Sequence, residues 1–144
     1  CQETGVDGII IPDCPYEESK EVSDICYKYD VDLISMIAPT SKERTLEIAA
    51  QAKGFIYLVS SMGVTGMRSN IVTDIEGIVE SIKTVTDTPV AVGFGINSPA
   101  QVKHFGNIAD GVIVGSAIVN LIKEHGDRAH QPLFNYIQTL IKEL

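Results

Sequence analysis

The sequence predicts an α/β fold built on parallel strands. Short apolar runs such as Val90-Ala-Val-Gly93 and Val112-Ile-Val114 lack the alternation of apolar and polar residues that a half-exposed strand shows. Both faces of these strands should therefore be buried, as in a parallel sheet. Helical patterns separate the runs, which recur about every 20 to 35 residues, the spacing of βα units. Because parallel connections are right-handed, the helices should form an outer layer.

The chain divides into five predicted βα units. The predicted strands cover residues 7–12, 33–38, 55–59, 90–93 and 112–114. A long connection, residues 60–72, follows the third strand and contains a Gly-Val-Thr-Gly motif. A connection of this length in a compact domain is often a functional loop or lid.

Helix start signals follow most of the strands. Glu17 and Glu18 place negative charge in the first turn of the first long helix, which the helix dipole favours. Capping boxes are predicted at Thr40 with Glu43, at Thr73 with Glu76, and at Ser98 with Gln101. Two further helices are predicted from about Ser116 and from about Asp127. Apolar residues at helical spacing predict buried faces in three helices: Val22, Ile25, Cys26 and Tyr29; Ile75, Ile78, Val79 and Ile82; and Leu133, Ile137, Leu140, Ile141 and Leu144.

Glycines end the last two predicted strands. Gly95 follows one, and Gly115 with Ser116 follows the next about twenty residues later. Glycine lets a ligand approach the peptide plane, and a helix that begins at a serine N-cap presents free amides to an anion. Barrels of the TIM type bind phosphate after strands seven and eight. The pair of turns therefore predicts a phosphate site.

Five units and 144 residues do not close a (β/α)8 barrel, which needs about 250 residues. The alternatives are an open, doubly wound sheet or the C-terminal portion of a barrel. The phosphate signature at the last two strands favours the second, so residues 1–144 are predicted to be a single domain, an incomplete (β/α) barrel of the TIM type.

Composition excludes several other classes of protein. The net charge of −8 and the pI of about 4.7 argue against nucleic-acid binding, because an acidic surface repels a phosphate backbone. No apolar run approaches the roughly 20 residues of a membrane span. Cys1, Cys14 and Cys26 lack the spacing of a zinc site or a disulfide framework, which suggests a reducing cytoplasm and no metal.

Four motifs in order closely resemble the tryptophan synthase alpha subunit family. They are Gly5-Val-Asp-Gly-Ile-Ile-Ile-Pro-Asp-Cys-Pro-Tyr-Glu-Glu-Ser19, Tyr57-Leu-Val-Ser-Ser-Met-Gly-Val-Thr-Gly66, Val90-Ala-Val-Gly-Phe-Gly-Ile96 and Ala109-Asp-Gly-Val-Ile-Val-Gly-Ser-Ala-Ile-Val119. The resemblance implies a barrel that cleaves indole-3-glycerol phosphate to indole and glyceraldehyde 3-phosphate by a retro-aldol reaction, and places strands four to eight in this chain.

The resemblance also assigns residues to the substrate and to a partner. It implies that the substrate contacts are Tyr57, Thr65, Gly66, Phe94, Gly95, Gly115 and Ser116. It implies a beta subunit that carries pyridoxal phosphate, so that this subunit needs no cofactor of its own. The surface that meets this partner would include Asp13, Pro15, Glu17, Glu18, Pro39 and Thr40.

The family's catalytic glutamate and aspartate fall upstream of Cys1, so no catalytic residue is assigned in this chain. The chain alone is therefore predicted to bind part of the substrate without lyase activity. Other phosphate-handling barrels, an epimerase or an isomerase, and a non-catalytic partner-binding module are the alternative functions. Strand edges left open in a partial barrel invite pairing, so self-association or a separate N-terminal piece is expected.

Overall fold

The chain forms a curved row of parallel strands with helices along its outer side. The computed structural model describes residues 1–60 and 74–144. The strands are β1 (Gly8–Ile9), β2 (Asp32–Leu33), β3 (Ser35–Ile37), β4 (Ile56–Val59), β5 (Val90–Gly93) and β6 (Gly111–Val112). The helices are α1 (Tyr16–Lys28), α2 (Lys42–Gln51), α3 (Ile75–Lys83), α4 (Pro99–Gly106), α5 (Ser116–His125) and α6 (His130–Ile141), with short 3-10 turns at Gln2–Thr4 and Gly126–Arg128.

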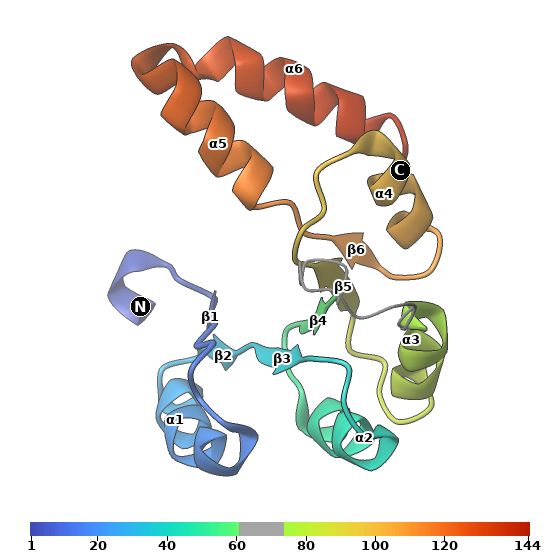
Figure 1. Cartoon of the computed structure of the whole chain (residues 1–144). Coiled ribbons are helices and arrows are strands. Elements are labelled where there is room, and N and C mark those ends of the chain that lie inside the picture. The colour runs from blue at the N-terminus through green and yellow to red at the C-terminus, as the bar shows by residue number, and fades with distance from the viewer. Residues whose placement is uncertain (61–73) are drawn as a thin grey trace.

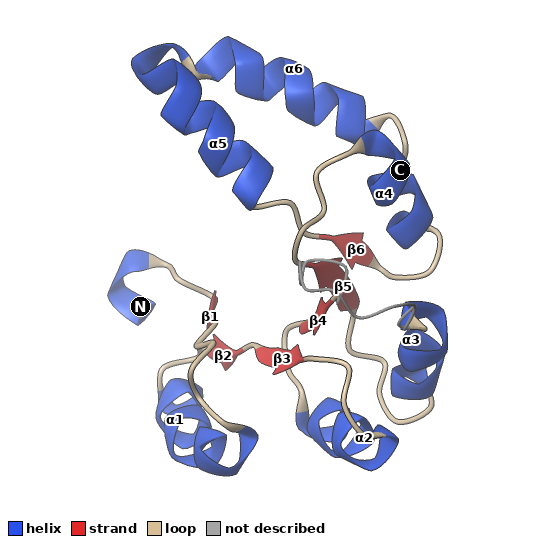
Figure 2. Ribbon diagram, in the orientation of Figure 1, coloured by secondary structure: helices blue, strands red, loops and turns tan. Residues whose placement is uncertain are grey.

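All described strand pairs are parallel, in the orders β1-β2 and β3-β4-β5-β6. Helices α1 to α4 lie along the outside of the arc, while α5 and α6 form a pair at its C-terminal end (Figure 1, Figure 2). A doubly wound sheet would instead carry helices on both faces. The parallel α/β prediction is confirmed, and the architecture is an incomplete (β/α) barrel.

The predicted strand over residues 33–38 is wrong in its continuity. The chain forms β2 and then β3, and the two are separated at Ile34. β2 pairs with β1, whereas β3 pairs with β4. The Ile34 amide still donates to the Ile9 carbonyl at 2.9 Å, so the pairing with β1 extends to the residue at the break. The described residues therefore form six short strands in two sheets, where five strands were predicted.

Side-chain caps begin three of the helices. The Ser98 and Gln101 capping box is confirmed at α4. The predicted box at Thr40 is wrong, because Ser41 is the N-cap of α2 and its hydroxyl accepts from the Arg44 amide at 3.3 Å. Thr73 lies outside the described residues, and Asp74 is the N-cap of α3. Short polar side chains compete for such positions, so sequence places a cap only to within a residue or two.

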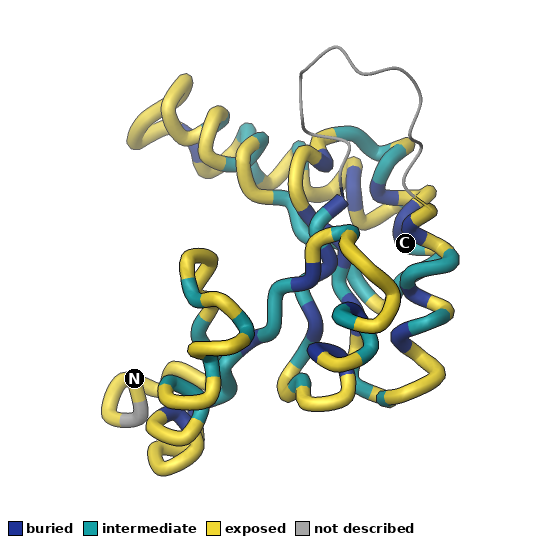
Figure 3. Tube along the Cα trace, turned by 60° about the horizontal axis from the view of Figure 1, so that its bottom comes forward, coloured by how far each residue is buried: buried dark blue, intermediate teal, exposed yellow. Residues whose placement is uncertain are grey.

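The core lies between β3–β6 and the inner faces of α2, α3 and α4 (Figure 3). Its most completely buried members are Ile37, Ala49, Ile56, Leu58, Ile82, Val90, Val92 and Phe105. The predicted apolar face of α3 is confirmed, with Ile75 and Val79 each 5% exposed. Burial of each large aliphatic side chain contributes roughly 1.5–3 kcal/mol, so this layer holds the carboxyl ends of β4–β6 in place.

The apolar faces predicted for the first and last helices are only partly buried. Cys26 and Leu140 are buried, but Ile25 of α1 is 57% exposed and Ile141 of α6 is 55% exposed. Helical spacing identifies which residues share a face, but it does not show how far a neighbouring element covers that face. The predicted burial of these two helix faces therefore holds only in part.

Candidate functional site

The carboxyl ends of β4, β5 and β6 lie side by side and form the frame of the candidate site. Val59 pairs with Gly93, and Val92 pairs with Val112, so these three strands end at the same edge of the sheet. The turns that follow β5 and β6 therefore emerge next to each other. This arrangement brings together the two glycine turns that the sequence singled out.

The turn after β5 has an unusual backbone. Phe94 and Gly95 have φ angles of 83° and 81°, both in the left-handed region. Glycine adopts this region freely, but a side chain such as that of Phe94 does so only under constraint. The constraint is visible at Ser60, which is fully buried and whose hydroxyl donates to the Phe94 carbonyl at 2.6 Å.

The far end of the same turn is held by α4 and α6. The side-chain oxygen of Gln101 accepts from the Asn97 and Ser98 amides at 3.0 and 3.2 Å. The Tyr136 hydroxyl, from α6, donates to the Asn97 carbonyl at 3.0 Å. Burial raises the pKa of the Tyr136 phenol, which keeps its donor proton in place.

The turn after β6 opens directly into α5. Gly115, not Ser116, is the N-cap of this helix, so the predicted N-cap role of Ser116 is wrong by one residue. No side chain caps the first turn of α5, which leaves its leading amides free for another acceptor. A Cβ placed at Gly115 would have no atom within 4 Å, so open space lies beside this peptide.

A cavity of about 390 Å³ joins the two turns. It is lined by Gly95, Ile96, Asn97, Ser116, Ala117, Asn120, Leu121, Glu124 and Tyr136. Glu124 lies eight residues beyond Ser116, about 12 Å along the helix, so its negative charge is at the opposite end from the leading amides. The arrangement can accept an anion where Gly95 faces the start of α5.

Two aromatic residues flank this region. Tyr57, in β4, crosses over Gly93: a Cβ added to that glycine would lie 2.5 Å from the Tyr57 hydroxyl oxygen. Phe94 is 53% exposed. Both side chains are at least partly exposed. Thr65 and Gly66, the other predicted substrate contacts, lie outside the described residues.

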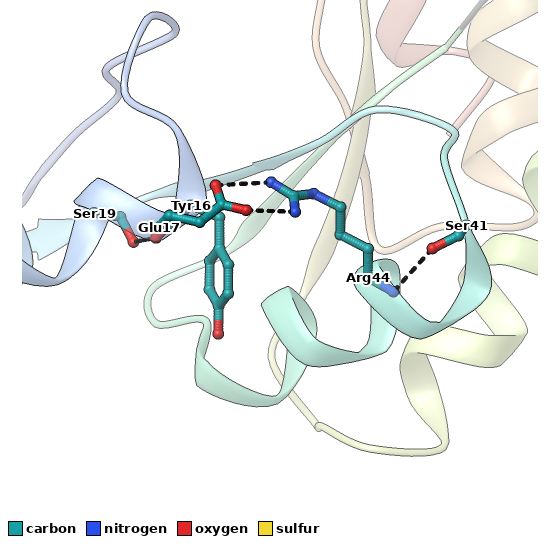
Figure 4. Close-up of polar contacts among 5 residues, drawn as sticks. All are labelled: Tyr16, Glu17, Ser19, Ser41 and Arg44. Carbon is teal, nitrogen blue, oxygen red and sulfur yellow. Dashed lines mark hydrogen bonds and ion pairs between the residues drawn. The ribbon is translucent and has the colours of Figure 1, made fainter.

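The predicted partner surface is formed by the loops that precede α1 and α2 together with the first turn of α1. Its members are Asp13, Pro15, Glu17, Glu18, Pro39 and Thr40, of which Pro39 is half-buried and the others are exposed. Glu17 forms a bidentate pair with Arg44, with oxygen-to-nitrogen distances of 2.6 and 3.0 Å (Figure 4). Hydrogen bonding to the guanidinium lowers the pKa of Glu17 to about 2. This pair links the N-terminal turns of α1 and α2.

Sequence reasoning missed four residues that support these features. Ser60, Asn97 and Tyr136 shape the turn after β5, and Arg44 pairs with Glu17. Only Ser60 and Tyr136 left a signal in the sequence. Ser60 is a small polar residue at the end of an apolar strand, and Tyr136 lies at helical spacing between Leu133 and Leu140. Neither signal indicates a hydrogen-bond partner.

Residues 1–60 and 74–144 contain no group of three or more His, Cys, Asp and Glu side chains placed to hold a metal ion. Within these residues, none of the helices is long and apolar enough to cross a membrane.

The chain matches a known protein family over almost its whole length. A family model described as "Tryptophan synthase alpha chain" matches residues 1–143. The tryptophan synthase alpha chain of Lactiplantibacillus plantarum is 53% identical over 126 residues, which are 87% of this chain and 48% of that relative. The corresponding chain of Geobacillus stearothermophilus is 44% identical over 131 residues, 91% of this chain and 49% of the relative. The chain thus spans about half the length of the curated relatives it matches.

Solved structures agree with the sequence comparison. A structure from Pyrococcus furiosus, described as the tryptophan synthase a2b2 complex, superposes with a TM-score of 0.83 at 34% identity. The match covers 98% of this chain and 58% of that one. A tryptophan synthase subunit alpha from Campylobacter jejuni superposes with a TM-score of 0.72 at 38% identity, over 85% of this chain and 50% of that one.

Proposed function

Because this chain belongs to the tryptophan synthase alpha chain family, we propose that it forms the phosphate-binding half of a site for indole-3-glycerol phosphate. The observation that carries the proposal is that Gly95 and Ser116, from two different turns, line one cavity. The backbone amides of these turns would donate to the phosphate oxygens, and the positive end of the α5 dipole would stabilise the charge.

The aromatic part of the substrate would lie toward Tyr57 and Phe94. Tyr57 is half-buried within β4, and Phe94 is 53% exposed beside Gly95. An indole ring has the size and apolarity to pack against two such rings. Thr65 and Gly66 remain proposed contacts on the basis of the family resemblance.

The proposed reaction of the whole protein is retro-aldol cleavage to indole and glyceraldehyde 3-phosphate. It needs one group to protonate the indole ring carbon and another to take a proton from the glycerol hydroxyl. Among the described residues that line the cavity, only Glu124 and Tyr136 can titrate. Glu124 is distant from the leading amides and the Tyr136 proton is donated to a carbonyl. We therefore expect no indole release from this chain alone.

The proposed partner is a tryptophan synthase beta subunit, which would carry the pyridoxal phosphate and receive the indole. The structure from Pyrococcus furiosus is described as an a2b2 complex, which supports this choice. The contact surface would be the loops before α1 and α2 and the first turn of α1, which together contain Asp13, Pro15, Glu17, Glu18, Pro39 and Thr40.

Titration with inorganic phosphate and with indole-propanol phosphate tests the proposed site. Amide chemical shifts of Gly95 and Ser116 should move on binding. Gly115→Val should abolish the response, because its methyl groups would occupy the open space beside the peptide without striking protein atoms at the Cβ position. The matched control is Gly111→Ala at the start of β6, whose added Cβ would lie 3.5 Å from the Ala91 Cβ, an ordinary contact. Unchanged phosphate binding by Gly115→Val would refute the proposal.

A further inference from the structure

The turn after β5 is fixed by two hydroxyl groups from elements distant in the sequence. Ser60 follows β4 and holds the Phe94 carbonyl, while Tyr136 belongs to α6 and holds the Asn97 carbonyl. Gly95 lies between these two contacts and lines the cavity. The turn is therefore restrained on both sides of the glycine that is proposed to meet the phosphate.

The conformation of this turn does not follow from its own residues alone. Phe94 is held at a φ angle of 83°, which a residue with a Cβ rarely adopts. Such strained positions persist where the surrounding structure determines them, and they concentrate at ligand sites. The hydrogen bond of 2.6 Å from the buried Ser60 hydroxyl acts directly on the carbonyl of this residue.

The second restraint belongs to the cavity wall itself. Tyr136 and Asn97 both line the cavity, and the phenol hydroxyl joins them at 3.0 Å. The Asn97 side-chain amide in turn donates to the Gly95 carbonyl at 3.3 Å. A chain of hydrogen bonds thus runs from α6 through Asn97 to the peptide of Gly95.

We propose that Ser60 and Tyr136 are positioning residues for the phosphate-binding turn, whose hydroxyls hold Phe94 and Asn97 so that Gly95 faces the start of α5. The inference rests on the proposed function, because it assigns these residues to the same phosphate site. Neither hydroxyl needs to touch the ligand. Their contribution is to preorganise the donors before the anion arrives.

The test compares Tyr136→Phe and Ser60→Ala with a matched control. Tyr136→Phe removes one oxygen atom and leaves the ring in place. Tyr16→Phe is the control, because the Tyr16 hydroxyl also makes one side-chain contact, with Gln51 at 2.5 Å between α1 and α2, away from the cavity. The dissociation constant for inorganic phosphate is measured from the Gly95 amide shift, and stability is measured by urea unfolding of the same samples.

Each of the two site variants should weaken phosphate binding about three- to tenfold, the effect of losing one net hydrogen bond, whereas Tyr16→Phe should bind like the wild type. The Gly95 amide resonance should also move in phosphate-free Tyr136→Phe, which a role in stability alone would not produce. If Ser60→Ala fails to fold, Tyr136→Phe still decides the question. Wild-type affinity and an unmoved Gly95 resonance in Tyr136→Phe, with the wild type binding phosphate at Gly95, would overturn this inference and leave the proposed function standing. A wild-type chain without any phosphate-dependent shift at Gly95 would overturn both.

Discussion

Replacing Gly93 with alanine should destabilise the fold by forcing an aromatic ring out of place. Gly93 is the last residue of β5 and is buried. An added Cβ would lie 2.5 Å from the Tyr57 hydroxyl oxygen, 2.7 Å from Cζ and 2.9 Å from Cε1. Real Cβ atoms do not approach other atoms so closely, so the ring of Tyr57 must move. Overpacking of this kind costs about 1–3 kcal/mol.

Second substitutions at Tyr57 separate the effect of its ring from that of its hydroxyl. In a Gly93→Ala background, Tyr57→Phe should give little relief, because Cζ and Cε1 remain in the path of the new methyl group. Tyr57→Leu should restore most of the loss, because it removes these atoms as well as the hydroxyl. A double-mutant cycle isolates this coupling from the cost of each single change.

Thermal and urea unfolding measure the effect. A loss of about 1–3 kcal/mol corresponds to a fall in Tm of about 3 to 10 °C for a domain of this size. Gly111→Ala serves again as the control, because its added Cβ makes only an ordinary contact. Two results would refute the reasoning: a Tm for Gly93→Ala equal to that of the wild type, or equal recovery with Tyr57→Phe and Tyr57→Leu.

Three other expectations concern charge and surface. The Lys83 ammonium and then the Val90 amide lower the pKa of Asp110. A carboxyl group whose pKa is lowered in the folded state stabilises the fold at pH values above its ordinary pKa of about 4. This stabilisation is lost as the pH falls through the lowered pKa of the folded state. Asp110→Asn should therefore flatten the acid side of a plot of stability against pH. Arg44→Met should raise the pKa of Glu17 from about 2 toward the ordinary range, which carbon-detected NMR titration of the carboxyl will measure; an unchanged value would show that the guanidinium is not the cause. Sedimentation velocity should show concentration-dependent association, because Val119 is 61% exposed and strand edges are open. The substitution Val119→Asp should reduce this association. A stable monomer at all concentrations would contradict the expectation.

Local patterns in the sequence were sufficient for much of the fold. Val90–Gly93 was predicted with its observed bounds, whereas the strand predicted over residues 112–114 overlaps β6 at Val112 alone. The Ser98–Gln101 cap was also predicted, since all of its partners lie within one turn of helix. The division of residues 33–38 into two strands was not predictable, because it depends on which strand pairs with each segment.

The candidate site also contains some features that the sequence could predict and others that it could not. Gly95, Gly115 and Ser116 were predicted as site residues because glycine after a buried strand has a local physical meaning, and Gly95 and Ser116 line one cavity in the structure. The left-handed conformation of Phe94 could not, since no property of phenylalanine favours it. Nor could the Glu17–Arg44 pair, whose members are 27 residues apart and meet only when α1 and α2 are packed.

The two ends of the strands differ in what their polar groups do. At the amino end of β5, the Asp110 carboxylate accepts from the Val90 amide at 2.7 Å and pairs with Lys83 at 2.6 Å, so the polar groups there satisfy one another. At the carboxyl end, the first turn of α5 has no side-chain cap and the turn after β5 holds a strained residue. Polar groups that pair with one another stabilise a fold, whereas unpaired donors and backbone strain are retained where a bound ligand can pair with the donors. Ser60 is informative for this reason: its buried hydroxyl restrains the carbonyl of the strained residue Phe94, beside the glycine that is proposed to meet the phosphate.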